Sequence, residues 1–443
     1  MSKSQIVAAI DIGTNKIVAI AGNKDELGRI KILGYGESPS KGVVRGSVQN
    51  IGDVASAISE AVNKCRTMSE LKFRDVFVGM SGQNIRSSVS SHTKYIASSE
   101  ITKADVDQLT NEVYNLNKEP GEEIIHVIPQ SYSVDNMNIG LSPVGFSGKK
   151  LVGDFLVIYG NANSSKAIRQ AVVTTGLNII KMIYKPVASA EAVLSSEDKE
   201  MGSLVADIGA GTTEVAIYHD KVLKSTSSIP FGGNSITSDI KQACQIIPRQ
   251  AEILKVKHAS ALSQAGDAKK VITIKGSNGR ANKEISLMDL TSITSARVDE
   301  IIAGIAHIME HSGCMNDISE VVLTGGTSKL ANICQLVKFR LGREVRIGRP
   351  RDLSDEGICL NEVEYSTIIG MLIKGFEYLP QAEASKMDAR IDSKSADNDK
   401  TDDSKSDKSK NDNGGAPKKT SFWEMIKSAA SKFLDVTDNS QRM

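Results

Sequence analysis

Two short stretches of the sequence place an acid, glycines and hydroxyl side chains between apolar runs: VAAIDIGTNKIVAI at residues 7–20 and LVADIGAGTTEVAI at residues 204–217. Each acid follows an apolar run with no polar alternation, which predicts a strand buried on both faces. The next glycine permits a tight turn and lets a ligand approach the backbone. Hydroxyl groups and free backbone N–H groups beside it suit phosphate oxygens. Both stretches are therefore predicted to be phosphate-binding turns.

The chain resumes as a strand after each turn, which predicts β-hairpins rather than a strand-to-helix phosphate loop. Two such hairpins can grip a polyphosphate from opposite sides. Asp11 and Asp207 would then hold Mg²⁺ through water, because this ion keeps much of its hydration shell. The alternative is a pair of ordinary structural turns, since Asp and Gly are common turn formers. The repetition between buried-strand patterns favours the phosphate site.

Further segments favour a nucleotide. VVLTGGTSKLANI at 321–333 predicts a strand, a double-glycine turn and a helix start, where a flat base can lie against the backbone. IPFGGNSITSDI at 229–240 places two glycines just before another predicted helix. In a third helix, Glu252 and Lys255 are three residues apart on one face, which suits ribose hydroxyls and a neighbouring polar group.

Small residues dominate two other predicted helices, KPVASAEAVLS at 185–195 and YSTIIGMLIKG at 365–375. Alanine, serine and glycine let two helix backbones cross closely, and a proline near the start suits the first helical turn. Such a pair would form a hinge between two lobes.

Composition excludes several classes of protein. The 443 residues carry a net charge of +1, with 54 basic and 53 acidic residues, so no bulk field favours nucleic acid. The first residues lack the apolar core of a signal peptide, and no apolar run is long enough to span a bilayer. The five scattered cysteines form no CxxC pair, which favours a reducing compartment. We expect a cytoplasmic protein that binds no nucleic acid.

The composition changes near residue 381. Residues 381–417 are rich in Ser, Asp, Lys and Asn and contain no aromatic residue, which predicts a disordered linker. Residues 418–443 are amphiphilic, and a helix over 420–436 would place its apolar side chains on one stripe bordered by lysines. This pattern favours an interfacial membrane helix over one that docks on the protein's own body or in a partner's groove. The predicted membrane residues are Phe422, Trp423, Ile426, Lys427, Lys432, Phe433 and Leu434.

The order of these motifs is that of the actin/hexokinase/DnaK ATPase superfamily: phosphate hairpin, connecting helix, second phosphate hairpin, adenosine turn and second connecting helix. The match covers residues 5–380. Within the superfamily the chain resembles the FtsA family of bacterial actin homologues. GVVRGSVQN at 42–50, VGMSGQNI at 78–85 and PVGFSGKKL at 143–151 carry this closer resemblance, together with the tethered C-terminal helix.

The resemblance implies an α/β, actin-like (ribonuclease H-like), two-lobed ATPase fold with an inserted subdomain of the FtsA type. The implied divisions are residues 1–85, 164–200 and 365–380 for the first lobe core, 86–163 for the inserted subdomain, 201–232 and 297–364 for the second lobe core, 233–296 for its small subdomain, 381–417 for the linker and 418–443 for the membrane-targeting tail.

The resemblance also implies roles for individual residues. Asp11 and Asp207 would face the metal and the reaction. Glu191 would position the attacking water, although a helix-surface Glu without a catalytic role is the equal alternative. The implied nucleotide contacts are Gly13, Thr14, Asn15, Lys16, Gly209, Gly211, Thr212, Thr213, Gly232, Gly233, Glu252, Lys255, Gly325, Gly326 and Thr327. The lysine of many actins lies two residues beyond Lys16, at the position of Val18.

The implied function is that of a cell-division protein that binds ATP and Mg²⁺, with at most a weak ATPase activity. Proteins of this family polymerise, bind the C-terminal tail of FtsZ, anchor FtsZ filaments to the cytoplasmic face of the inner membrane at the division site, and recruit later division proteins. Arg249 and Arg297 would suit an acidic partner peptide. For Arg297, the alternative is an ordinary salt bridge.

Two other functions of the same superfamily remain as alternatives. A small-molecule kinase or phosphatase would need a substrate pocket with its own base and would leave the tethered tail unexplained. A pilus-assembly actin homologue shares the inserted subdomain, but the tail argues against it. His307 and His311 are four residues apart in AHIMEHSG, yet no HExxH motif or third ligand accompanies them, so solvated helix histidines are the favoured interpretation.

Overall fold

The computed structural model describes residues 5–82, 85–264, 269–276 and 281–379. The predicted linker at 381–417 and the predicted membrane helix, with its residues from Phe422 to Leu434, lie outside the described residues. Among the helices that the structure describes, none has the length and apolar character needed to cross a bilayer.

The first sheet has five strands in the order β11-β6-β1-β2-β3. The strands are β1 (Val7–Ile12), β2 (Lys16–Lys24), β3 (Ile30–Pro39), β6 (Asp75–Met80) and β11 (Asn178–Tyr184). Strands β1, β2 and β3 are antiparallel neighbours, whereas β6 runs parallel to both β1 and β11. Apart from Asp11, every residue of β1 is buried, as its apolar run predicts.

The second sheet repeats this topology in the order β14-β13-β12-β17-β18. Its strands are β12 (Ser203–Ile208), β13 (Thr213–His219), β14 (Val222–Ile229), β17 (Glu320–Thr324) and β18 (Glu344–Ile347). Again three antiparallel strands are followed by two parallel ones, so β12 and β13 correspond to β1 and β2. The repeated sequence motif therefore reflects a repeated arrangement of strands.

Helices and two separate two-stranded sheets, β4-β5 and β15-β16, accompany the two five-stranded sheets. They are β4 (Val43–Val44), β5 (Ser47–Val48), α1 (Ile51–Ser69), α3 (Ala162–Thr174), α4 (Lys185–Val193), α5 (Ser196–Met201), α6 (Gly233–Cys244), α7 (Pro248–His258), β15 (Val271–Ile274), β16 (Lys283–Ser286), α8 (Leu287–His311), η2 (Met315–Asp317), η3 (Gly326–Lys329), α9 (Ile333–Leu341) and η4 (Val363–Tyr365). A last helical segment covers residues 366–379.

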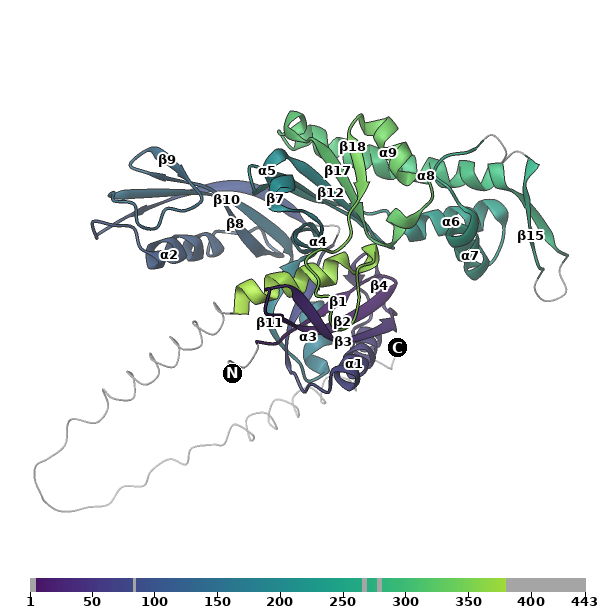
Figure 1. The fold of residues 1–443 in the computed structure, drawn as a ribbon, viewed down its shortest axis with the longest axis horizontal. Coiled ribbons are helices and arrows are strands. Elements are labelled where there is room, and N and C mark those ends of the chain that lie inside the picture. Colours follow the sequence, from purple (N-terminus) through teal and green to yellow (C-terminus); the bar gives the residue numbers. More distant parts are fainter. Residues whose placement is uncertain (1–4, 83–84, 265–268, 277–280, 380–443) are drawn as a thin grey trace, which may run out of the picture. The chain divides into compact units, whose positions relative to one another are not determined.

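A third sheet is inserted between β6 and β11 and has its own core. Its order is β7-β10-β8-β9, all antiparallel, with β7 (Arg86–Tyr95), β8 (Glu122–Val134), β9 (Met137–Gly140) and β10 (Lys150–Asn161). Helix α2 (Lys103–Tyr114) lies along this sheet (Figure 1). Leu109 and Val113 of α2 pack with Leu151 and Phe155 of β10 in a cluster separate from the two main cores. A capping box between Thr102 and Asp105 starts the helix.

The two predicted small-residue helices do cross closely, as the sequence indicates. A Cβ atom at Gly370, in the segment 366–379, would collide with the carbonyl oxygen of Ala188 in α4. Gly370 therefore permits direct contact between the two helix backbones. Residues of both helices belong to one core cluster, which also includes Val205 and Val322 of the second sheet. The crossing thus joins the two five-stranded sheets.

Candidate functional site

The two hairpin turns close in the same way. Gly13 N donates to Lys16 O over 3.0 Å in the first turn, and Gly209 N donates to Thr212 O over 3.0 Å in the second. A Cβ atom at Gly13 would lie 2.6 Å from Lys16 O, so this turn requires glycine. In each hairpin the acid is the second-last residue of the incoming strand, which places Asp11 opposite Val18 and Asp207 opposite Glu214.

The two turns also meet each other, although they are far apart in the sequence. The Cα of Gly211 approaches Thr14 so closely that an added Cβ would collide with the threonine hydroxyl, and it would lie 3.0 Å from the Cα of Arg45. Both turns line one cavity of about 380 Å³. The predicted residues that line this cavity are Asp11, Gly13, Thr14, Asn15, Lys16, Asp207, Gly209, Gly211, Thr212, Glu252, Lys255, Gly325, Gly326 and Thr327.

Three other predicted contacts lie just behind the cavity wall. Gly233 N donates to Gly209 O over 2.9 Å, and a Cβ at Gly232 would lie 2.6 Å from the same oxygen. Thr213 is buried, and its hydroxyl donates to Phe231 O over 2.9 Å. These residues hold the second turn in place rather than face the cavity.

Asp207 is held by the two crossing helices. Its Oδ2 accepts hydrogen bonds from Ser189 Oγ of α4 at 2.6 Å and from Thr367 Oγ1 of the last helical segment at 2.8 Å. Burial raises the pKa of this carboxyl. Sequence reasoning missed both hydroxyl residues. Each is a polar side chain within one of the two predicted small-residue helices, and this feature of the sequence could have identified them.

Asp11 has a different partner. Lys185 Nζ, at the start of α4, lies 2.8 Å from Asp11 Oδ1 and donates to the backbone carbonyl of Ile12 over 2.6 Å. Asp11 Oδ1 is buried, and the Lys185 ammonium is its charged neighbour. Sequence reasoning missed Lys185 as well, because a lysine before a helix proline has no distinctive pattern.

Glu214 is a third acid of the cavity and, like Asp207, it is buried. Both of its carboxylate oxygens are buried, with the hydroxyl residues Thr212 and Ser228 beside them. Burial raises the pKa of Glu214 to about 7. The hairpin register, which pairs Glu214 with Asp207, was the signal that could have revealed it.

The other end of the cavity is formed by α7 and the turn after β17. Lys255 Nζ lies 2.8 Å from Glu252 Oε2 and donates to Gly233 O over 3.0 Å. Thr327 Oγ1 donates to Gly209 O over 2.9 Å, which ties the glycine turn after β17 to the second hairpin. The predicted glycine turns and the predicted Glu/Lys pair are thus brought together around one cavity.

Family models match most of the described chain. A model described as "Cell division protein FtsA" matches residues 204–370, and one described as "SHS2 domain inserted in FTSA" matches residues 82–159. Cell division protein FtsA of Neisseria meningitidis serogroup B is 30% identical over 393 residues, which cover 88% of this chain and 95% of the relative. The chain belongs to the FtsA family. FtsA of Pseudomonas aeruginosa is 29% identical over 401 residues, covering 90% of this chain and 96% of that protein.

Solved structures show that this FtsA-family chain has the actin-like fold. The chain of a PilM–PilN type IV pilus biogenesis complex superposes with a TM-score of 0.61 at 15% identity, covering 83% of this chain and 98% of that one. MreB5 of Spiroplasma citri bound to ADP superposes with a TM-score of 0.54 at 13% identity, covering 85% and 98%. The predicted fold class is confirmed.

Glu191 does not reach the cavity of this FtsA-family chain. Its carboxylate pairs with Lys199 Nζ at 2.8 Å and Lys374 Nζ at 3.2 Å, and it lines a different pocket. Ser189, two residues earlier on α4, faces Asp207, and two helical residues span roughly 200° of rotation. Glu191 therefore lies on the face of α4 opposite Ser189. The structure does not place it beside the cavity, where it was expected to position the attacking water.

The two predicted partner-binding arginines lie on different helices, Arg249 on α7 and Arg297 on α8, and they differ in exposure and in their contacts. Arg297 makes two contacts with Asp239, at 2.6 Å and 3.0 Å, and stacks 5.1 Å from the Phe231 ring centre. The salt-bridge alternative is therefore what the structure contains at Arg297. Arg249 is exposed on α7.

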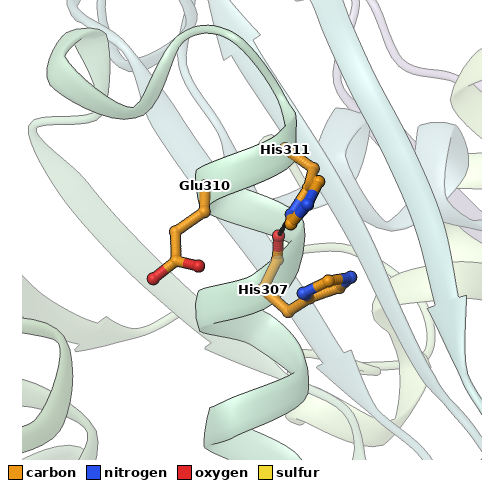
Figure 2. A group of neighbouring side chains, drawn as sticks. All are labelled: His307, Glu310 and His311. Atoms are coloured by element: carbon orange, nitrogen blue, oxygen red, sulfur yellow. Dashed lines mark hydrogen bonds between the residues drawn. The ribbon is translucent and has the colours of Figure 1, made fainter.

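One group of three side chains among the described residues could share a metal ion: His307, Glu310 and His311 of α8 (Figure 2). Their ligand atoms lie within 4.8 Å of one another, so the expectation that no third ligand accompanies the histidines was wrong. All three side chains are exposed and come from one helix, so no second element encloses an ion. His311 Nδ1 lies 2.8 Å from the His307 carbonyl oxygen. We assign this group no role.

Proposed function

We propose that this FtsA-family chain binds ATP with Mg²⁺ in the cavity between its two hairpin turns. The observation that carries the proposal is the contact of Gly211 with Thr14, which brings both phosphate-type turns to one cavity. Backbone N–H groups and hydroxyls of both turns suit phosphate oxygens. Two solved structures with the same fold are those of MreB5 of Spiroplasma citri bound to ADP and to AMPPNP.

The residues present fit a hydrated Mg²⁺ ion. Asp11, Asp207 and Glu214 supply the oxygen ligands that Mg²⁺ prefers. Both oxygens of Glu214 are buried, and Asp11 Oδ1 is buried beside the Lys185 ammonium. The three acids are not among the described groups whose ligand atoms lie within 4.8 Å of one another, so they would hold the ion through water, as the sequence predicts for Asp11 and Asp207. When bound, Mg²⁺ would neutralise part of the phosphate charge.

Calorimetric titration of ATP into the full chain with Mg²⁺ tests the proposal. Asp207→Asn removes a cavity charge, and Asp220→Asn is the matched control. Asp220 lies in the turn at the other end of β13, has φ of 52°, and lies outside the residues that line the cavity. Asparagine tolerates this backbone conformation. We expect the control to bind like the unaltered chain and Asp207→Asn to bind far more weakly. Equal affinities of the two variants would contradict the proposed site.

The proposed role in division is recruitment rather than catalysis. With Glu191 paired to Lys199 and Lys374 outside the cavity, the site fits ATP binding with at most slow hydrolysis. ATP would draw the two halves together and favour self-assembly on lipid. Filament formation that is independent of nucleotide would contradict this step.

We further propose that the chain anchors FtsZ filaments to the inner membrane and recruits later division proteins. Family membership supports this proposal, together with the amphipathic sequence of residues 418–443. The exposed Arg249 suits contact with the acidic FtsZ tail better than Arg297, which Asp239 already occupies. Co-sedimentation of FtsZ with liposomes should require residues 418–443, whereas ATP binding should not. FtsZ that pellets with the truncated chain would contradict the anchoring role.

A further inference from the structure

Four lysines among the described residues line the cavity: Lys16, Lys185, Lys255 and Lys329. Three of them are paired with acids other than Asp11, Asp207 and Glu214. Lys16 pairs with Glu37 at 2.9 Å, Lys255 with Glu252 at 2.8 Å, and Lys329 with Glu364 at 2.7 Å. Lys185 alone among the four pairs with Asp11, one of the three central acids.

We call Asp11, Asp207 and Glu214 the acid triad. The side chain of Lys185 is only 12% exposed, and its ammonium group sits between the carboxylate of Asp11 and the carbonyl oxygen of Ile12. Asp207 and Glu214 line the same cavity as Lys185, so its positive charge acts on them across the cavity as well as on Asp11.

The fold keeps a path open for the Lys185 side chain. A Cβ atom added to Gly79 of β6 would lie 3.0 Å from Lys185 Cε and 3.3 Å from Asp11 Oδ1. Gly79 thus leaves the space in which the lysine stem reaches the acid. The ion pair is placed by three elements: β1, β6 and the start of α4.

Resting on the proposed nucleotide site, we infer that Lys185 is a built-in counter-ion of the acid triad, and that it makes nucleotide binding only weakly dependent on Mg²⁺. A buried cavity with three acids repels a triphosphate strongly, because charges interact more strongly there than in water. A bound divalent cation would ordinarily relieve that repulsion. The lysine supplies part of this charge, and its flexible stem lets the ammonium turn from Asp11 to a phosphate oxygen.

Binding of ATP to the full chain, measured in excess Mg²⁺ and again in EDTA, tests the inference. When Mg²⁺ is removed, the unaltered chain is expected to lose less than about tenfold in affinity for ATP, because the charge of Lys185 remains in the cavity. A neighbouring opposite charge shifts such equilibria by about ten- to a thousandfold. Lys185→Met keeps the length of the stem without its charge. On removal of Mg²⁺ with EDTA, Lys185→Met is expected to lose ATP affinity by a factor roughly tenfold or more greater than the unaltered chain does. Lys185→Arg should behave like the unaltered chain.

Lys16→Met is the matched comparison, because Lys16 lines the same cavity but pairs with Glu37 rather than with the acid triad. It is expected to weaken binding by a similar factor with and without Mg²⁺, so that its ratio of the two Kd values stays that of the unaltered chain. An equal ratio for Lys185→Met would overturn the inference. A steep Mg²⁺ requirement in the unaltered chain would also overturn it, even if the methionine variant failed to fold.

A second measurement does not depend on nucleotide. Mg²⁺ alone should raise the melting temperature of Lys185→Met, whose acid triad lacks its counter-ion, and should leave that of the unaltered chain nearly unchanged. Equal responses would overturn the inference. Absence of ATP binding in the unaltered chain under both conditions would instead refute the proposed nucleotide site, and the melting comparison would still decide the role of Lys185.

Discussion

The two hairpins have the same topology and the same backbone closure, but their acids are held in opposite ways. Asp207 is buried and accepts hydrogen bonds from Ser189 and Thr367, one from each crossing helix. Asp11 is 19% exposed, and its carboxylate pairs with the ammonium of Lys185. Equivalent positions in a repeat can thus become one acid held by hydroxyl groups and one acid paired with a lysine ammonium.

Neutralising each acid in turn gives the largest expected effect. Asp207→Asn should weaken binding of Mg²⁺-ATP by about 100-fold, because losing a charged partner of a buried site costs about 3 kcal/mol. Asp11→Asn should weaken it by only about tenfold, because Lys185 already offsets part of that charge. Calorimetry on both variants measures the difference. Equal losses would show that the two acids are equivalent and would break the comparison.

Glu214, whose counterpart in the first hairpin is Val18, should make the stability of the protein depend on pH. Burial raises its pKa from 4.5 to about 7, so in this range the folded state keeps a proton that the unfolded state releases. The stability from this proton is complete below about pH 4.5 and is lost as pH rises through about 7. Without metal or nucleotide, Glu214→Gln should therefore be about 2 kcal/mol more stable than the unaltered chain at pH 8, and nearly equal at pH 4.5.

Urea unfolding across this pH range measures the effect. Glu200→Gln is a suitable control, because Glu200 is exposed on α5 and pairs with Lys221. It should follow the unaltered chain at every pH. A Glu214→Gln curve parallel to that of the unaltered chain would mean that Glu214 titrates normally.

Replacing the equivalent glycine of each turn with alanine should lower the free energy of unfolding by different amounts, and this difference is smaller than the effects above. A Cβ at Gly13 would lie 2.6 Å from Lys16 O, whereas one at Gly209 would lie 3.2 Å from Thr212 O. Gly13→Ala should therefore lower the free energy of unfolding by about 2 kcal/mol and Gly209→Ala by about 1 kcal/mol or less. Urea unfolding at fixed pH ranks the two, and the reverse order would contradict the geometry.

Glu191→Gln should have the smallest effect on the site. Its carboxylate pairs with Lys199 and Lys374 on the face of α4 away from Asp207, so ATP affinity should stay within about twofold. Removal of these partly buried ion pairs should still cost about 1 kcal/mol of stability. A loss of ATP affinity as large as that of Asp11→Asn, measured by calorimetry, would show that Glu191 does take part in the site.

The parts of the site that sequence reasoning found are those encoded locally. An apolar run, an acid and a glycine turn specify a hairpin within a few residues, and small residues specify a close helix crossing. Ser189, Thr367 and Lys185 were missed because their directions depend on how two helices rotate against the sheets. The same cause explains Glu191: the helix was predicted, but the face that meets Asp207 was not.

Asp207 has a mechanical consequence beyond its charge. The carboxylate that faces the cavity is fastened by single hydroxyl groups to both helices at the crossing, with no intervening residue. A ligand that displaced the Asp207 carboxylate would therefore act on both helices directly, through two hydrogen bonds rather than through a chain of side chains.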